Sequence, residues 1–319
     1  MRILNRADIR ALVDVAALVP AIRAAMQRVS QGKTDMPLRS MIPVGGGRLF
    51  GIMTGAMREP DVHGAKLLSL YPDNPNHGRS SHCGVEVIFD AETGLPSACI
   101  DAAELTAIRT AAATAVATDA LARPDATRLA LIGCGEQAHS HIAAMRAVRP
   151  ITSIVVWGRD AAKAAAFGRE NGVEVAGSVA AAIEGADIVC TTTPAREPLL
   201  MRAMLRSGLH INAVGASIPT MQEIATDVVP AVHLVTDYRP SLEAQAAEVI
   251  DARRTGLVGP DVTFTEIGEV LNGARPGRMT AADITLYRSL GVAAQDLAGT
   301  MAILALAEAA GRGTVVAWD

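Results

Sequence analysis

The chain has 319 residues, of which half are hydrophobic, 19% are charged and only 3% are aromatic. This length favours two domains, and cores filled by Ala, Val, Leu and Ile are typical of α/β proteins. A formal charge of −4 without any basic run excludes a bulk attraction to nucleic acid or to acidic membranes.

The first hundred residues predict helices followed by an antiparallel β unit. Apolar residues recur at helical spacing through residues 1–30, and we expect Pro20 to open the second helix there. Clusters of Gly, Pro, Asn and Asp then divide short strand-like runs, with turn signals at Gly45–Gly47 and Glu92–Gly94. The predicted strands are Arg48–Thr54, Gly64–Leu70, Gly84–Phe89 and Leu95–Ile100.

A helix predicted over Asp101–Leu121 leads to Arg123–Asp125, a candidate crossing between domains. Alternating strands and helices follow, which favours a parallel sheet with helices on both faces. A final helix is expected over Ala281–Ala310, returning to the first domain. We therefore expect a doubly wound Rossmann domain over residues 121–292, inserted in a smaller, discontinuous α+β domain of residues 1–120 and 293–319. The parallel strands are predicted at Leu129–Ile132, Ile154–Trp157, Ile188–Thr191, His210–Ala213 and Leu234–Thr236.

A G-x-G-x-x-A run at residues 133–138 lies between a predicted buried strand and a helix over Glu136–Val148. Gly133 and Gly135 permit a tight turn, and Ala138 lets the helix pack closely on the strand. Free backbone N–H groups and the positive end of the helix would receive a phosphate there. A second strand about twenty residues on completes the context of a dinucleotide site. A Gly-rich turn without a ligand is the plainer alternative.

The end of that second strand predicts which dinucleotide binds. NAD-selective domains carry an acidic residue there, whereas this chain has Gly158 followed by Arg159. The guanidinium of Arg159 can hold a 2′-phosphate bidentately, unless it is only a solvated loop charge. Asp160 is explained as the N-cap of the next helix. NADPH is thus favoured, with NADH possible. Thr192, at the end of the next strand, is expected to contact the nicotinamide half or to form only a Thr-rich turn before Pro194.

The four cysteines show neither C-x-x-C pairs nor zinc spacing and are expected to be reduced, mostly buried thiols. His139 and His141 are two apart on a predicted helix, so they point to different faces and predict no metal pair. No signal peptide is apparent, and no apolar run approaches the roughly 18 residues of a membrane helix. We expect a cytoplasmic protein without a metal.

Eight motifs, taken in order, resemble those of the ornithine cyclodeaminase/mu-crystallin family over nearly the whole chain. They are Pro37-Leu-Arg39, Gly64-Ala-Lys66-Leu, Ser81-His82-x-Gly84, Leu105-Thr-Ala-Ile-Arg109-Thr110, Gly133-x-Gly135-x-Gln137-Ala138, Asn212-Ala-Val-Gly215-Ala216-Ser217, Gly268-Glu-Val-Leu-x-Gly273 and Ile284-Thr-Leu-x-x-Ser289-Leu-Gly291. The resemblance implies a Rossmann domain inserted in a small domain that dimerises. It also implies redox chemistry at the α-carbon of amino or imino acids with NAD(H) or NADP(H).

By the same resemblance, Arg39, Lys66 and Arg109 clamp the substrate carboxylate, for which guanidinium groups are well shaped. Lys66 has independent support because it interrupts an apolar strand, where a lysine without a partner is costly. Lys66 and His82 are candidate proton donors, although His82 can equally be structural. The other contacts implied are Leu290 for the substrate, and Ser81, Arg109, Gly133, Gly135, Glu136, Gln137, Gly158, Arg159, Thr192 and Ser289 for the cofactor.

Ser217 departs from the cyclodeaminases of the family, which carry a proton-handling aspartate there. A serine hydroxyl cannot act as that base unaided, and Ser217 resembles the ketimine-reductase branch instead. Glu223 matches a glutamate of the family and is expected to be structural. We therefore expect an NADPH-dependent reductase of cyclic imino acids, pyrroline-2-carboxylate or piperideine-2-carboxylate, in which Ser217 orients the imine or only satisfies the backbone at a strand end. The alternatives are an ornithine- or lysine-type cyclodeaminase, an amino-acid dehydrogenase, and a non-catalytic protein that binds NADPH and a small carboxylate.

Overall fold

The computed structural model describes residues 1–318, which form two compact units. Unit 1 comprises Met1–Ala112 and Val292–Asp319, and unit 2 comprises Ala113–Gly291. The division falls inside helix α3 (Ala102–Leu121), so Arg123–Asp125, the crossing expected from the sequence, lies within unit 2. Nowhere in residues 1–318 is there a helix long and apolar enough to cross a membrane.

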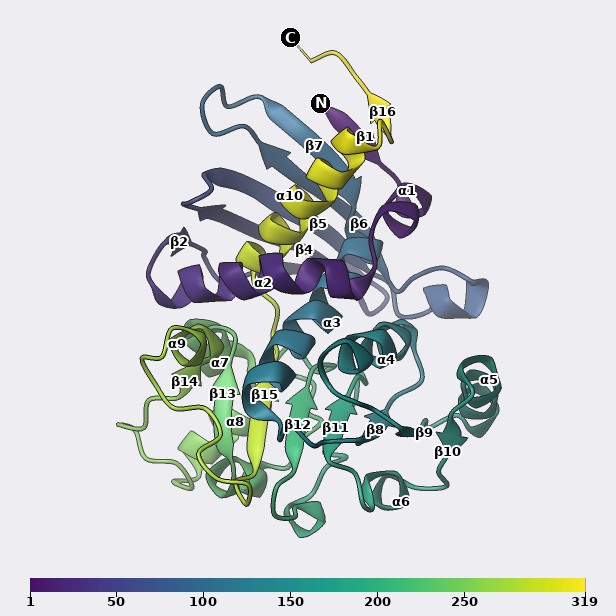
Figure 1. Ribbon diagram of the computed structural model, residues 1–319, viewed down its shortest axis with the longest axis vertical. Helices are drawn as coiled ribbons and strands as arrows, with labels where there is room; N and C mark the ends of the chain where they lie inside the picture. Colours follow the sequence, from purple (N-terminus) through teal and green to yellow (C-terminus); the bar gives the residue numbers. More distant parts are fainter. Residues whose placement is uncertain (319) are drawn as a thin grey trace. The chain divides into compact units, whose positions relative to one another are not determined.

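Unit 1 is a mixed sheet with helices packed on one face (Figure 1). The strand order is β16-β1-β7-β6-β5-β4-β2, with β3 paired to β4. Strands β4 to β7 are antiparallel as predicted, and β3, which was not predicted, is antiparallel to β4. The strands are β1 (Arg2–Leu4), β2 (Thr34–Asp35), β3 (Ser40–Gly45), β4 (Arg48–Met57), β5 (Val62–Leu70), β6 (His82–Phe89), β7 (Pro96–Asp101) and β16 (Thr314–Val315). The helices are α1 (Arg6–Leu12), α2 (Val15–Ser30), the first part of α3, α10 (Ala293–Ala309) and the 3-10 turn η1 (Asn74–His77).

The register of the central strands gives the two faces of this sheet opposite characters. Met53, Lys66 and Glu86 lie opposite one another across β4, β5 and β6, and all three are buried. Successive residues of a strand point to opposite faces. Ile52 and Val85 accordingly lie on the other face and are exposed. The sheet therefore buries a lysine and a glutamate beneath α10, which packs on β4, β5 and β6.

Unit 2 is a parallel sheet in the order β10-β9-β8-β11-β12-β15-β13-β14 (Figure 1). The order reverses between β8 and β11, which makes their carboxyl ends the switch point where ligands of such sheets bind. The strands are β8 (Arg128–Ile132), β9 (Ser153–Trp157), β10 (Glu174–Val175), β11 (Ile188–Thr191), β12 (His210–Ala213), β13 (His233–Thr236), β14 (Thr265–Glu266) and β15 (Thr285–Arg288). The helices are α4 (Glu136–Val148), α5 (Ala161–Asn171), α6 (Val179–Ile183), α7 (Arg239–Gln245), α8 (Ala247–Arg254) and α9 (Ile267–Leu271), with 3-10 turns η2 (Arg202–Met204) and η3 (Thr226–Ala231).

Two predictions about helices are wrong. Helix α2 begins at Val15, where the Asp14 side chain accepts from the N–H of Ala17, so Pro20 lies inside the helix and does not open it. This cap, together with the burial of Val15, extends the helix ahead of the proline. The final helix α10 begins only at Ala293, because Thr285–Arg288 forms the buried strand β15. Periodicity alone does not separate a short buried strand from a helix.

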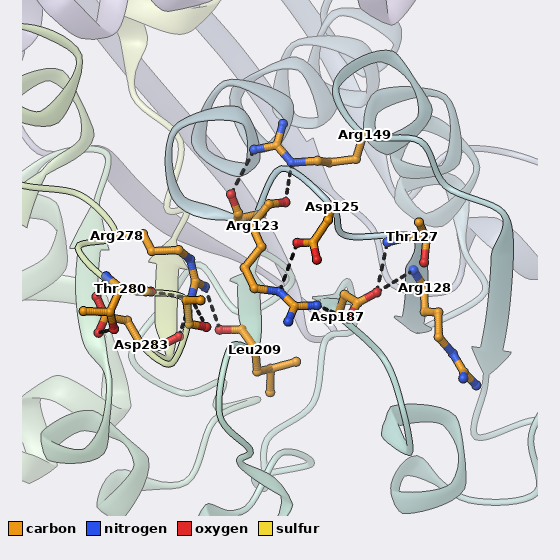
Figure 2. A network of polar contacts seen from close by, with 12 residues as sticks. Arg123, Asp125, Thr127, Arg128, Arg149, Asp187, Leu209, Arg278, Thr280 and Asp283 are labelled. Atoms are coloured by element: carbon orange, nitrogen blue, oxygen red, sulfur yellow. Dashed lines mark hydrogen bonds and ion pairs between the residues drawn. The ribbon is translucent and has the colours of Figure 1, made fainter.

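A dense polar network lies at the amino edge of the parallel sheet (Figure 2). Arg149 donates to the carbonyls of Thr118, Asp119, Ala122 and Arg123, and so closes the C-terminal end of α3. Arg278 donates to the carbonyls of Leu121 and Leu209. Asp187, just before β11, accepts from Arg123 and from the backbone N–H groups of Thr127 and Arg128 at the start of β8. Cations at a helix C-terminus are stabilising, so this cluster fastens α3 to the sheet.

Candidate functional site

The buried face of unit 1 holds an ion cluster centred on Asp296 of α10. Lys66 Nζ lies 2.7 Å and Arg109 Nε 2.8 Å from Asp296 Oδ1. Arg109 also donates to Gln295 Oε1 at 2.9 Å. Lys66 and Asp296 are each 1% exposed. The partner that a buried Lys66 requires is therefore Asp296, a residue that the sequence analysis did not identify.

Glu86 completes this cluster as a fourth ionisable group. It is the cross-strand neighbour of Lys66, and within residues 1–318 its Oε2 has no hydrogen-bond partner. Burial and the charge of Asp296 raise the pKa of Glu86 well above its ordinary value, and Lys66 and Arg109 oppose this shift only in part. This environment favours the neutral form of Glu86, since an unpaired buried carboxylate is costly.

The cluster consequently carries an excess of positive charge. Burial lowers the pKa of Lys66 to about 8, with Asp296 acting in the opposite direction, so the ammonium is still present at neutral pH. Burial alone would raise the pKa of Asp296, but Arg109 and Lys66 hold it below its ordinary value. Two cations thus surround one carboxylate, which leaves a site that favours an incoming anion.

Arg39 and His82 lie at the border of this cluster. Arg39 is half-buried and immediately precedes β3. The pKa of His82 is lowered to about 4, first by desolvation and then by the charges of Lys66, Arg109 and Arg39. The residues predicted to clamp a carboxylate therefore act on one imidazole, whose Nδ1 lies 3.0 Å from Ser81 Oγ.

In unit 2 the predicted phosphate turn follows β8 as expected. Gly133 has a φ of 123°, and a Cβ added to it would lie 2.6 Å from Thr192 Oγ1, so only glycine fits this strand end. Gly135 precedes α4 and borders open space. Glu136 and Gln137 form the first turn of α4, and Ala138 is fully buried against the sheet. These residues fit a dinucleotide diphosphate at a helix N-terminus.

The end of β9 bears on cofactor choice. A Cβ added to Gly158 would lie 2.6 Å from Cys134 Sγ, so an acidic side chain there requires Cys134 to move. Arg159 is exposed and has no partner in the described chain. Asp160 caps α5 by accepting from the N–H groups of Ala162 and Lys163, as predicted. A guanidinium is thus available at this strand end, and a carboxylate is not.

Ser217 lies in the loop after β12, half-buried, and its hydroxyl has no hydrogen-bond partner among residues 1–318. The interpretation of Ser217 as a serine that only satisfies the backbone is therefore not supported. Ser289 follows β15, and its N–H donates to the carbonyl of Ala213. Leu290 packs in the core of unit 2 and donates its N–H to Asp237, an unexpected place for a substrate contact.

Three residues of these sites were missed or undervalued at the sequence level, namely Asp296, Glu86 and Glu223. Asp296 is the one charged residue among the buried positions of α10, a signal of the same kind as Lys66 in its strand. Glu223 is fully buried and accepts hydrogen bonds from the loops after β11 and β12. Burial raises the pKa of Glu223, and the bonds from Thr193 and Thr191 oppose that shift. No group of three or more potential metal ligands occurs in the described part of the chain.

Comparison with known proteins extends over nearly the full chain. A ketimine reductase mu-crystallin of Mus musculus is 33% identical over 286 residues, which cover 88% of each chain. The structure of Thermococcus litoralis Δ1-pyrroline-2-carboxylate reductase, in complex with NADH and L-proline, superposes with a TM-score of 0.93 at 29% identity, covering 99% of this chain and 100% of that one. An archaeal alanine dehydrogenase dimer with bound NAD gives 0.91 at 26% identity, covering 100% and 99%. The sequence model of the ornithine cyclodeaminase/mu-crystallin family matches residues 1–310, and the chain belongs to this family.

Proposed function

We propose that this protein is an NADPH-dependent reductase of cyclic imino acids, which converts pyrroline-2-carboxylate or piperideine-2-carboxylate to proline or pipecolate. Relatives named as ketimine and pyrroline-2-carboxylate reductases support an oxidoreductase of this class. The observation that carries the choice of reaction is Ser217, a hydroxyl at the position of the proton-handling aspartate of the cyclodeaminases. A cyclic ketimine that arrives protonated needs no strong base before reduction, so a serine is sufficient there.

The substrate carboxylate is assigned to the cation cluster of unit 1. Lys66 and Arg109 outnumber Asp296 in charge, and Arg39 adds a third cation within electrostatic reach of His82. A carboxylate between these groups would offset part of this excess positive charge, while neutral substrates would gain nothing from them. The roles of Lys66 are to hold this anion and to serve as a proton donor.

The cofactor is assigned to the carboxyl edge of the sheet in unit 2. Gly133, Gly135, Glu136 and Gln137 would hold its diphosphate, and Gly158 with Arg159 its 2′-phosphate. Thr192 and Ser289 follow the strands on the other side of the switch point, and Ser81 of unit 1 is a further predicted contact. When bound, the nicotinamide supplies the hydride that the imine carbon accepts. Ser217 would accept a hydrogen bond from the protonated imine nitrogen, directly or through a bridging water, and so orient the ring.

We also propose a homodimer. Ile42, Ile52 and Val85 lie on the same face of the sheet of unit 1 by register, and they are 53%, 37% and 37% exposed. A contiguous apolar face of this kind is typical of an association surface, and a dimer is named for a similar structure. Light scattering is expected to give twice the mass of the chain, and a monomer at micromolar concentration would contradict the assignment.

The direct test of the function is oxidation of NADPH in the presence of a panel of substrates. We expect turnover with five- or six-membered ketimine acids and little with straight-chain 2-oxo acids plus ammonia. Failure with every cyclic ketimine acid would overturn the proposal. Ammonia release from ornithine with the nucleotide retained would identify a cyclodeaminase, and turnover of an open-chain amino acid would identify a dehydrogenase. Tight NADPH binding without any reaction would identify a binding protein.

A further inference from the structure

One buried carboxylate joins the two loops that follow β11 and β12. Glu223 accepts from the hydroxyl of Thr191 at 2.9 Å and from both the N–H and the hydroxyl of Thr193 at 2.6 Å. It also accepts from the N–H groups of Gly215 and Ala216 at 2.8 and 3.2 Å. Glu223 is 1% exposed. These bonds connect three stretches of chain that are separate in sequence.

The division of the donors between the two carboxylate oxygens requires a carboxylate. Oε1 accepts from both donors of Thr193, and Oε2 accepts from the Thr191 hydroxyl and from the N–H groups of Gly215 and Ala216. Each oxygen therefore faces at least one backbone N–H, which can only donate. A glutamine of the same shape would set its NH₂ group against such a donor in either orientation, and a buried clash of donors is destabilising.

The place of this carboxylate in the fold points to one half of the cofactor site. The phosphate turn follows β8, and the Gly158–Arg159 pair follows β9 on one side of it. Because β11 and β12 continue the sheet on the other side of the switch point, their loops border the opposite end of a bound dinucleotide. The loops after β11 and β12 are closely packed, since a Cβ on Gly215 would lie 2.2 Å from the Thr193 nitrogen.

We infer that Glu223 is a positioning residue for the nicotinamide half of the site. It fixes the Thr191–Thr193 loop and holds the peptide of Ala216, the residue before Ser217. Through these contacts it sets where Thr192 and the Ser217 hydroxyl stand. The inference rests on the proposed function for the identity of the ligand, and it gives Glu223 a role beyond that of a structural residue.

The test is Glu223→Gln, with Asp187→Asn as its matched control. Asp187 also accepts from two backbone N–H groups, but at the amino end of the same strand β11 (Figure 2). Binding of NADPH is measured by its fluorescence, binding of the adenosine fragment 2′,5′-ADP by calorimetry, and folding by thermal denaturation. We expect Glu223→Gln to lower kcat about a hundredfold, as a small misplacement of reacting groups does.

The same variant should bind NADPH several-fold more weakly and 2′,5′-ADP as the wild type does. Asp187→Asn should lower the Tm and leave kcat and both dissociation constants unchanged. Wild-type kcat and NADPH affinity in Glu223→Gln would overturn the inference. A parallel loss of 2′,5′-ADP binding would also overturn it, because the effect would then extend to the whole domain.

If Glu223→Gln does not fold, Thr191→Val takes its place. The buried Thr191 hydroxyl donates to Glu223, so the variant removes one of the five donors and keeps the shape of the side chain. We expect the same pattern on a smaller scale, and an unchanged kcat would contradict the inference. The binding measurements need no substrate. If the variant binds NADPH more weakly and 2′,5′-ADP normally, but the wild type reduces no imine, the proposed function alone is overturned. If the wild type and the variant reduce the imine equally well, this inference alone is overturned.

Discussion

The two edges of the sheet in unit 2 are built from the same materials and differ in what they leave unbonded. At the amino edge, the guanidinium groups of Arg149 and Arg278 are taken up by backbone carbonyls (Figure 2). At the carboxyl edge, Arg159 has no partner among residues 1–318, nor does the hydroxyl of Ser217. Gly135 there borders open space. Both edges are charged and neither is fully bonded, since within residues 1–318 the buried Nε of Arg123 at the amino edge has no hydrogen-bond partner. The carboxyl edge differs because its unpartnered groups follow the strands beside an open glycine turn that precedes a helix.

A group of arginines is therefore evidence for a ligand only when its donors are not already bonded to protein acceptors and its charge is not already paired with protein carboxylates. The ion cluster of unit 1 is intermediate by this measure. Its cations are bonded to Asp296, yet one positive charge remains in excess. We therefore place it with the carboxyl edge, and the variants below test this division.

The largest effect is expected for Lys66→Met. Loss of the ammonium removes the excess positive charge and leaves Asp296 with Arg109 as its single cation. Truncation of one partner in a buried charge pair at a binding site costs about 2–5 kcal/mol. We expect kcat/KM for the imino acid to fall roughly 10²- to 10³-fold. The control is Lys33→Met, which removes an exposed lysine of the same unit. Equal activity of the two variants would contradict the assignment of the cluster.

Arg149→Met tests the other side of the division. The side chain donates to four backbone carbonyls at the end of α3, and hydrogen bonds from a charged donor are individually strong. The free energy of unfolding, measured by urea denaturation, should fall by about 2–4 kcal/mol. The kcat/KM of the folded variant should stay at the wild-type value. A loss of activity without a loss of stability would contradict the assignment of the amino edge to stability and of the carboxyl edge to ligand binding.

A smaller and selective effect is expected for Arg159→Ala. The KM for NADPH should rise about tenfold or more, because charge-assisted bonds to a phosphate contribute about 1.5–3 kcal/mol. The KM for NADH should change less than about twofold, since the 2′-phosphate is the group recognised. Arg169→Ala, on the exposed part of α5, serves as the control. Equal changes for both nucleotides would show that Arg159 does not select between them.

The smallest effect is a dependence on pH. The protonated form of Lys66 favours the bound carboxylate, and this form is present below its pKa of about 8 and lost above it. The inhibition constant of pyrrole-2-carboxylate, a planar analogue without an imine, should be level below pH 7. It should rise up to tenfold per pH unit above pH 8. A constant value up to pH 9.5 would argue against Lys66 as the binding group.

Much of this architecture is visible in the sequence because the signals are local. The run Gly133–Ala138 predicts the phosphate turn and its helix, and Asp160 predicts its own cap. Lys66 in an apolar strand predicts a buried charge. Its partner could not be found in this way, since Asp296 is 230 positions away and meets Lys66 only through packing of α10 on the sheet.

Predictions from local sequence patterns fail where burial in the tertiary structure determines the conformation or the partners of a residue. Thr285–Arg288 becomes a strand because β12 and β13 accept it between them, although its apolar pattern also continues into α10. Pro20 lies inside α2 and not at its start because the cap at Asp14 begins the helix further upstream. Glu223 illustrates the same limit at the functional level. Three of its five donors belong to Thr191 and Thr193, which are 32 and 30 positions away, and no pattern around residue 223 indicates them.

The most direct test of the account is the fate of hydride from NADPH that is dideuterated at C4 of the nicotinamide. With pyrroline-2-carboxylate as substrate, we expect proline with one deuterium on the carbon that bears the carboxylate, measured by mass spectrometry and NMR. Proline without deuterium, or ammonia release with no net oxidation of the nucleotide, would contradict direct reduction of a cyclic imine.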